Sequence, residues 1–284
     1  MVSVGILRIS RVVADLDRAK AFYRDALGFR AVSRGGVDPA VLSAFDASDA
    51  GALEVVMRLG AEDMALVRFA RPGRPYPRDG RSDDLGFQHA AIVVSDMDAA
   101  YAHLCLQREW LPISEGGPQA LPPANGAVRA FKFRDPDGHP LELLWFPPGQ
   151  GRPVWRESGA RTPFLGIDHS ALCVASSRRS LRFYRTLGFK VSEPSQNQGP
   201  AQARLDALPC VQVRVTGLRP ASPHGPGLEL LEYQPSGRPA GVTALSDGVT
   251  DWVTFAVHQA SGRLPQGVQD PDGHRLLLVE GEAT

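Results

Sequence analysis

Two short stretches decide the fold: Phe87–Val94, FQHAAIVV, and Asp135–Leu144, DPDGHPLELL. The first is an apolar run with β-branched residues and with His89 near its start, which indicates a buried strand. In the second, the sequence Asp-Pro-Asp-Gly is typical of a tight turn, and a strand that carries Glu142 follows it. The two stretches therefore predict one imidazole and one carboxylate on two strands of one small unit.

Pieces of this unit recur along the chain. Val13–Phe29 returns as Val174–Phe189, an offset of 161 residues, and both read as a strand end, a capping residue and an amphipathic helix that ends at a glycine. The turn at Asp135–His139 returns at Asp270–His274. Self-similarity of this kind predicts a duplicated two-module gene.

We therefore expect four modules in two domains. The domains are 1–150 and 164–284, and the modules are 4–71, 84–147, 164–234 and 248–281. The fourth module is much shorter than the others, so we expect it to have lost its helix or its middle strands. Stretches rich in proline and glycine, 71–81 and 147–153, separate the modules and are expected to be linkers or surface loops.

A strand with a histidine, a helix, the Asp-Pro-Asp-Gly turn and a final Leu-Glu-Leu strand together resemble the half-module of the vicinal oxygen chelate superfamily. That superfamily includes glyoxalase I, extradiol dioxygenases and bleomycin resistance proteins. The resemblance implies an α+β fold in which tandem βαβββ modules form two curved mixed-sheet cups, here with the fourth module truncated. It also implies a metal-binding His or Gln on the first strand of a module and a Glu on the last.

Aligning the repeats assigns the two ligand positions in each module. The first-strand residues, in modules one to four, are Arg8, His89, His169 and Trp252; the last-strand residues are Ala65, Glu142, Glu229 and Leu277. Only modules two and three keep both ligand types. If neighbouring modules pair, two half-built sites result. If module two pairs with three and one with four, as in fused glyoxalase-like proteins, one complete site and one empty site result, and we favour this pairing.

The expected metal ligands are His89, Glu142, His169 and Glu229. Two imidazoles and two carboxylates leave room for two waters in an octahedron and suit Zn, Ni, Co, Mn or Fe(II). Each residue also has a plain structural interpretation, because a strand histidine is often only part of the core and a strand glutamate can face water. The leucines beside each glutamate share the opposite strand face, which favours an inward carboxylate. His139 and His274 are expected to belong to their turns, and Glu232 to the other strand face.

The resemblance to glyoxalase I implies a metal-dependent lyase or isomerase that abstracts a proton from a small carbonyl or thiol-adduct substrate, with Glu142 or Glu229 as the base. A metal-free small-molecule binding protein of the bleomycin resistance type is the first alternative. An extradiol dioxygenase is the second. Its usual iron positions here hold His169, Trp252 and Leu277, so a dioxygenase would need His89, His169 and one glutamate instead.

Composition excludes several other classes. The 31 basic and 31 acidic residues cancel, so we expect no nucleic-acid or membrane partner. The resemblance implies a small-molecule substrate, and a chain of four fused modules can act as a monomer or a homodimer. The first eighteen residues lack the apolar core of a signal peptide, which predicts a cytoplasmic protein. The three cysteines are widely spaced and are expected to be reduced, mostly buried thiols.

Overall fold

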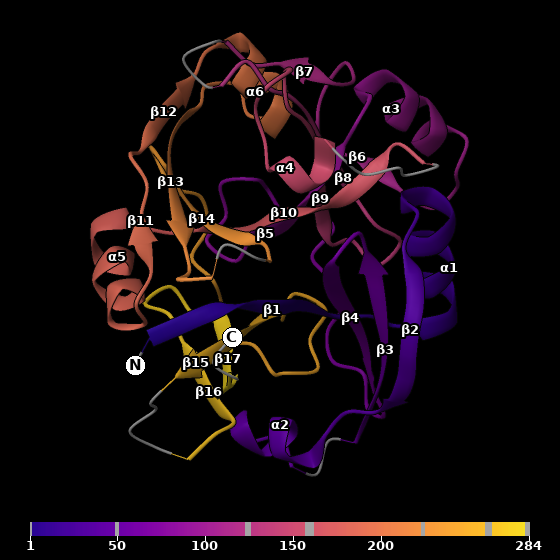
Figure 1. The fold of residues 1–284 in the computed structure, drawn as a ribbon, viewed down its shortest axis with the longest axis vertical. Coiled ribbons are helices and arrows are strands. Elements are labelled where there is room, and N and C mark those ends of the chain that lie inside the picture. The colour runs from indigo at the N-terminus through magenta and orange to yellow at the C-terminus, as the bar shows by residue number, and fades with distance from the viewer. Residues whose placement is uncertain are drawn as a thin grey trace.

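The computed structural model describes residues 2–48, 51–122, 126–156, 162–222, 225–258 and 263–281. Its strands form two large mixed sheets, one above the other in Figure 1. The seven-stranded sheet, sheet A, has the order β16–β17–β15–β1–β4–β3–β2. The main path of the ten-stranded sheet, sheet B, is β11–β13–β14–β10–β5–β9–β8–β6, with β12 on β13 and β7 on β8.

The strands of sheet A come from the two ends of the chain. They are β1 (Val2–Val12), β2 (Arg30–Gly36), β3 (Ala52–Leu59), β4 (Glu62–Phe69), β15 (Trp252–His258), β16 (Gln266–Gln269) and β17 (Arg275–Glu280). The strands of sheet B come from the middle of the chain. They are β5 (Gln88–Val94), β6 (Leu111–Pro112), β7 (Gln119–Ala120), β8 (Arg129–Arg134), β9 (Pro140–Trp145), β10 (Phe164–Cys173), β11 (Lys190–Val191), β12 (Ser195–Gln198), β13 (Gln212–Arg219) and β14 (Gly227–Tyr233).

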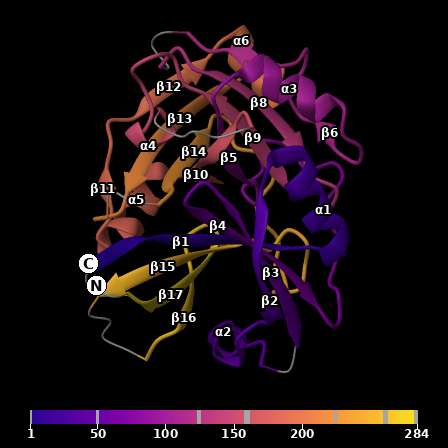
Figure 2. The same cartoon turned by 45° about the vertical axis from the view of Figure 1, so that its right-hand side comes forward.

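Module pairing follows from these two sheets. In sheet A, β1 of module one pairs antiparallel with β15 of module four, and in sheet B, β5 of module two pairs antiparallel with β10 of module three. Figure 2 shows β1 and β15 side by side. The favoured pairing, two with three and one with four, is confirmed. Each sheet thus takes strands from both of the ranges 1–150 and 164–284, whose role as domains stays a prediction.

Helices cover the outer faces of the sheets. These covering helices are α1 (Leu16–Leu27), α3 (Met97–Cys105) and α5 (Ser177–Thr186), which pack in the hydrophobic cores. Helices α2 (Pro39–Ala44) and α6 (Pro200–Asp206) lie toward the concave faces, and the short α4 (Pro153–Arg156) lies between β9 and β10 in the chain. The repeated segments form α1 and α5 as expected. Asp15 and Ser176 cap their first turns, and Gly28, with φ of 73°, takes the left-handed turn after α1.

Hydrophobic cores join modules in a different way from the sheets. One core packs α1 and α3 between the strands of modules one and two, with additions such as Ile167, and a second packs α5 between the strands of modules three and four, with Ile6 added. Module four contributes β15, β16 and β17, and its described residues contain no helix, which confirms the truncation. Each half of the chain therefore keeps a core of its own while its strands complete two shared sheets.

The two repeated turns are held by the two repeated helices. Tyr23 of α1 donates a hydrogen bond to Asp135, at 3.0 Å, and Tyr184 of α5 donates one to Asp270, at 3.1 Å. The glycine of each turn has a φ near 95°, a conformation that a residue with a Cβ rarely adopts. Both tyrosines are fully buried, so they lie on the packing faces of the two amphipathic helices.

The cysteines only partly follow expectation. All three are free thiols, but only Cys173 is buried, whereas Cys105 and Cys210 are exposed. The expectation of mostly buried thiols was therefore wrong, because Cys105 ends a surface helix and Cys210 lies in the loop before β13. Among the described helices, none is both long enough and apolar enough to span a membrane.

Candidate metal centre

Strand register brings the four expected ligands to one face of sheet B. In the parallel pair of β5 and β9, Ala91 lies opposite Glu142, and in the parallel pair of β10 and β14, Ala171 lies opposite Glu229. Each histidine precedes that alanine by two residues, so its side chain lies on the same face as the glutamate. Because β5 and β10 are neighbours, all four side chains meet at the centre of the sheet.

Three of the four side chains form a compact cluster. Ligand atoms of His89, Glu142 and His169 all lie within 4.8 Å of one another. His89 Nε2 donates a hydrogen bond to Glu142 Oε2 at 3.1 Å, and His169 Nε2 lies 3.8 Å from the same oxygen. Glu229 stands slightly apart, with its Oε2 atom 3.5 Å from His169 Nε2. The structure thus brings all four predicted residues together, three of them tightly.

Burial differs between the two glutamates. His89, Glu142 and His169 are buried, whereas the Glu229 side chain is 29% exposed. The leucines on either side of each glutamate point the other way and are packed in the cores, as the sequence indicates. Glu232 also lies on the other face, where its carboxylate accepts a hydrogen bond from the first turn of α5 at Ser177. The inward position therefore belongs to Glu142 and Glu229.

Asp168 orients the second histidine. Its Oδ2 atom accepts a hydrogen bond from His169 Nδ1 at 2.8 Å, which directs Nε2 toward Glu142 and Glu229. His169 Nε2 is buried and makes no hydrogen bond among the described residues. A carboxylate behind a metal-binding histidine is a common way to fix its tautomer. The sequence shows Asp168 beside His169, but periodicity could not reveal this contact.

Burial and the charges of neighbouring groups shift the pKa values of all four side chains. Burial, Lys132 and His169 lower the pKa of His89 to about 4. Burial also lowers the pKa of His169, but Glu229, Asp168 and Glu142 outweigh it and raise this pKa to about 9. Burial raises the pKa of Glu142, but His89 and Lys132 outweigh it and lower this pKa to about 2. For Glu229 burial dominates and raises the pKa. Glu142 is thus the firmly ionised carboxylate, and Glu229 the more basic one.

A cavity of about 310 Å³ opens above the four residues. Its wall includes Lys132, a buried ammonium on β8, which donates a hydrogen bond to Asp206 at the end of α6 at 2.7 Å. This pair ties module two to module three across the cleft. Lys132 was not predicted from the sequence to line the site. A signal was present, because Lys132 lies between the buried Phe131 and Phe133 just as Glu142 lies between two buried leucines.

The donor set fits a divalent transition metal. Two imidazoles and two carboxylates are ligands of intermediate softness, and one imidazole nitrogen is buried without a partner beside two carboxylate oxygens. The cluster can hold such an ion, whose identity the residues do not fix.

Sheet A repeats the same geometry with other residues. Ser10 lies opposite both Ala65 and Trp252, and Thr254 lies opposite Leu277, so the ligand positions are those that the repeat alignment assigns. Trp252 and Leu277 are buried in an apolar cluster with Val41 of α2. Arg8 instead forms an ion pair with Glu54 at 3.5 Å. No metal-ligand cluster forms there among the described residues.

Comparison with known proteins agrees with this geometry. Residues 5–143 match the family model of the glyoxalase/bleomycin resistance protein/dioxygenase superfamily. Comparison with curated proteins found no match. Glyoxalase I from Zea mays has a similar fold, with a TM-score of 0.60 and 17% identity over 97% of this chain and 92% of that one.

A putative dioxygenase from Bacillus subtilis subsp. subtilis str. 168 is similar as well. Its TM-score is 0.57, with 13% identity over 98% of this chain and 86% of that one. At these identities the two structures bear on the fold alone. The part of the chain that the family model covers, residues 5–143, belongs to the glyoxalase/bleomycin resistance protein/dioxygenase superfamily, also called the vicinal oxygen chelate superfamily. The remaining strands complete the same two sheets.

Proposed function

We propose that the protein is a metal-dependent lyase or isomerase of the glyoxalase type, acting on a small carbonyl or thiol-adduct substrate. The observation that carries this proposal is the convergence of His89, Glu142, His169 and Glu229 from two modules at the floor of one cavity. The similar fold of a glyoxalase I supports it. The four residues would hold the ion, which would act as a Lewis acid on the oxygens of the substrate.

Glu229 is the better candidate for the base. Its pKa is raised by burial, its side chain is the most exposed of the four, and its nearest charged partner is a single histidine. Glu142, in contrast, accepts a hydrogen bond from His89 and has its pKa held at about 2. Glu229 would take the proton from the carbon next to the carbonyl and return it to the neighbouring carbon. Lys132 stabilises negative charge in the same cleft.

Metal analysis tests the site. One divalent ion per chain is expected in protein purified without chelator, and its loss is expected in both His89→Ala and His169→Ala. His258→Ala is the matched control, because His258 lies at the end of β15 in the other sheet. Absence of metal after loading with Zn, Ni, Co, Mn or Fe(II) would contradict the proposal and favour a metal-free binding protein.

Kinetics test the base. With the hemithioacetal of glutathione and methylglyoxal as substrate, Glu229→Gln should lower kcat by about 100- to 10,000-fold while the metal content falls less than in the histidine variants. Glu142→Gln should mainly reduce metal content. If both variants lose metal and activity in parallel, Glu229 is a ligand without a separate proton-transfer role.

One observation favours a second candidate, a dioxygenase. The compact cluster of His89, His169 and Glu142 has the composition of the two-histidine, one-carboxylate triad of non-haem Fe(II) oxygenases. Oxygen uptake by the Fe(II)-loaded protein with catechol separates the two candidates. Uptake that survives in Glu229→Gln would assign the site to ring cleavage, and no uptake with any metal would leave the isomerase.

A further inference from the structure

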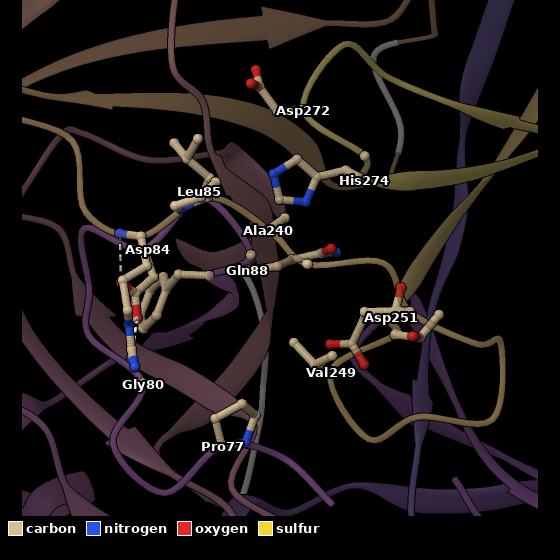
Figure 3. A pocket seen from close by; sticks show the side chains of 18 of the residues that line it. Pro77, Gly80, Asp84, Leu85, Gln88, Ala240, Val249, Asp251, Asp272 and His274 are labelled. Carbon is tan, nitrogen blue, oxygen red and sulfur yellow. Dashed lines mark hydrogen bonds and ion pairs between the residues drawn. The ribbon is translucent and has the colours of Figure 1, made fainter. Parts of the chain in front are cut away.

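A second cavity, separate from the metal centre, lies where two linkers meet: the first linker joins β4 to β5 (residues 70–87), and the second joins β14 to β15 (residues 234–251). Its volume is about 700 Å³, more than twice that above the metal centre. Figure 3 shows Gln88, Asp251 and His274 placed around the same hollow. Pro77, Leu85, Ala240 and Val249 add apolar surface to its wall. A cavity of this size with a few polar groups is typical of small-molecule sites.

The two linkers that enclose the cavity hold each other reciprocally. Arg74 of the first linker pairs with Asp247 of the second at 2.7 Å, and Arg238 of the second pairs with Asp84 of the first at the same distance. Backbone hydrogen bonds accompany both ion pairs: the amides of residues 73 and 237 donate to carbonyls of residues 246 and 83. The wall is therefore preformed, and a ligand would not have to order it.

Two polar side chains on this wall are also fixed. Gln88 Nε2 donates a hydrogen bond to Ser170 Oγ at 3.0 Å. His274 Nε2 donates one to the backbone oxygen of Cys173 at 2.8 Å. Both contacts lead into β10 of sheet B, so the cavity floor is continuous with the sheet that carries the metal centre.

Most charged groups of the wall are neutralised by neighbours. Besides the two linker pairs, Arg81 pairs with Asp83, and Asp272 pairs with Arg179. The carboxylate of Asp270 accepts hydrogen bonds from Tyr184 and from backbone amides of its own turn. The paired groups offer no free charge to a ligand. Asp270 keeps its negative charge, but its oxygens are engaged by these neutral donors.

Asp251 does not attract a cation either. Its carboxylate lies 3.5 Å from Arg11 Nε and 3.6 Å from His139 Nε2, both buried behind the cavity wall. Asp135 lies on the far side of His139, at 3.0 Å, so the four groups balance one another. A cationic ligand next to Asp251 would also approach the positive charge of Arg11.

Arg275 is the exception. Its guanidinium donates hydrogen bonds to Oγ1 and the backbone oxygen of Thr243, at 2.8 and 2.6 Å. Across the part of the chain that the structure describes, no carboxylate lies within ion-pair distance of it, and Asp247, the nearest in effect, is held by Arg74. Burial lowers the pKa of Arg275, so its charge is incompletely solvated. Such a guanidinium is suited to bind a carboxylate through its remaining N–H groups.

We propose that this cavity binds a small organic anion, with its carboxylate at Arg275 and its apolar body against Pro77, Leu85 and Val249. This site is distinct from the metal centre and does not depend on the function proposed for it.

The test compares three ligands that share one ring system: 1-naphthoate, 1-naphthamide and 1-naphthylmethylamine. Each is titrated calorimetrically into the full chain with its metal content as purified. Naphthoate is expected to bind at least tenfold more tightly than the amide, and the amine most weakly. Equal binding of all three, tighter binding of the amine, or no binding would overturn the proposal.

Variants locate the ligand. Arg275→Gln should remove the tenfold advantage of naphthoate and leave the amide unchanged, whereas Arg214→Gln, at an exposed position on β13, should change neither. Gly86→Leu should weaken all three ligands, because a Cβ at Gly86 meets only Ala240 and Val249, at 3.9 Å, and the longer side chain enters the cavity. Unchanged naphthoate binding in Arg275→Gln would refute the assignment, as would loss of binding in His89→Ala.

Discussion

The centres of sheet A and sheet B have the same strand register, but the side chains at the ligand positions are mostly apolar in sheet A and polar in sheet B. In sheet B, His89 and Glu142 line a cavity, whereas in sheet A the equivalent Trp252 and Leu277 are packed as core. The short helices differ in the same way. Helix α2 places apolar side chains on the floor of sheet A, and α6 places Asp206 beside Lys132 and leaves the floor of sheet B open. The same backbone arrangement therefore supports an open cavity with polar side chains in sheet B and a packed apolar core in sheet A.

Truncating a last-strand side chain to alanine in each sheet should give opposite results. Leu277→Ala should cost about 3 kcal/mol of unfolding free energy, because a fully buried leucine leaves a cavity, and should not change metal binding. Glu229→Ala should change the stability of the metal-free protein little, since burial already disfavours its charge, and should weaken metal binding. Urea denaturation and metal titration measure both. Equal stability losses would mean that the two centres are not functionally different.

The turn histidines are a second pair to compare. His139 lies between Asp135 and Asp251, and after burial, which lowers the pKa, these carboxylates dominate and raise it to about 9. In the equivalent place, His274 donates to a backbone oxygen and Gln88 stands where the first site has Asp251. Both histidines belong to their turns, as the sequence indicates.

Stability should therefore fall with rising pH through His139. A pKa raised above the unfolded value of about 6.5 stabilises the fold fully below pH 6.5, and this stabilisation is lost as pH rises through 9. We expect a loss on the order of 2 kcal/mol between pH 6.5 and 9. Denaturant unfolding across that range measures it. His139→Gln should make the dependence shallower, with the remainder due to His169, whose pKa is also raised to about 9, and His274→Gln should leave it unchanged. The same slope in all three proteins would contradict the role of His139.

Metal affinity should depend on pH through His169. Its pKa of about 9 means that the metal-free ring is protonated at neutral pH, and a metal can bind only the deprotonated nitrogen. Affinity should rise about tenfold per pH unit between pH 7 and 9 and then level off. Titration calorimetry in buffers of different ionisation enthalpy counts the released proton. His89, with a pKa of about 4, should contribute none in this range.

Sheet A keeps polar atoms that no longer have partners. The hydroxyls of Ser10 and Thr254 are buried without a hydrogen bond among the described residues. Thr254→Val should therefore leave the protein as stable or stabilise it by about 1 kcal/mol, since it removes an unsatisfied group at nearly constant shape. Thermal unfolding measures the effect, with Thr216→Val in sheet B for comparison. A loss above about 1 kcal/mol would show that the hydroxyl of Thr254 has a partner.

Sequence pattern predicted those features that depend on strand alternation. The leucines beside Glu142 and Glu229 indicated which strand face the two carboxylates share. The repeat alignment assigned His89 and His169 to first strands and favoured the correct pairing of module two with three and one with four. It could not show that α2 fills one floor, because a six-residue helix has too little periodicity to reveal its packing face. Nor could the sequence pattern show the ion pair of Lys132 with Asp206, or the two ion pairs in which an arginine of each linker contacts an aspartate of the other. These contacts join residues far apart in the chain and have no local signal.

The pairing of the outermost modules has a consequence for synthesis on the ribosome. Strands β5 to β14, which make up sheet B, have all been translated before the first residue of β15. Strand β1 has its parallel neighbour β4 early, but its other edge has no partner until Trp252 and the residues after it emerge. Sheet B can thus be complete while an edge of sheet A is still open, and open edges are where nascent chains pair wrongly. The last thirty or so residues close that edge, and a chain that stops before them leaves β1 exposed.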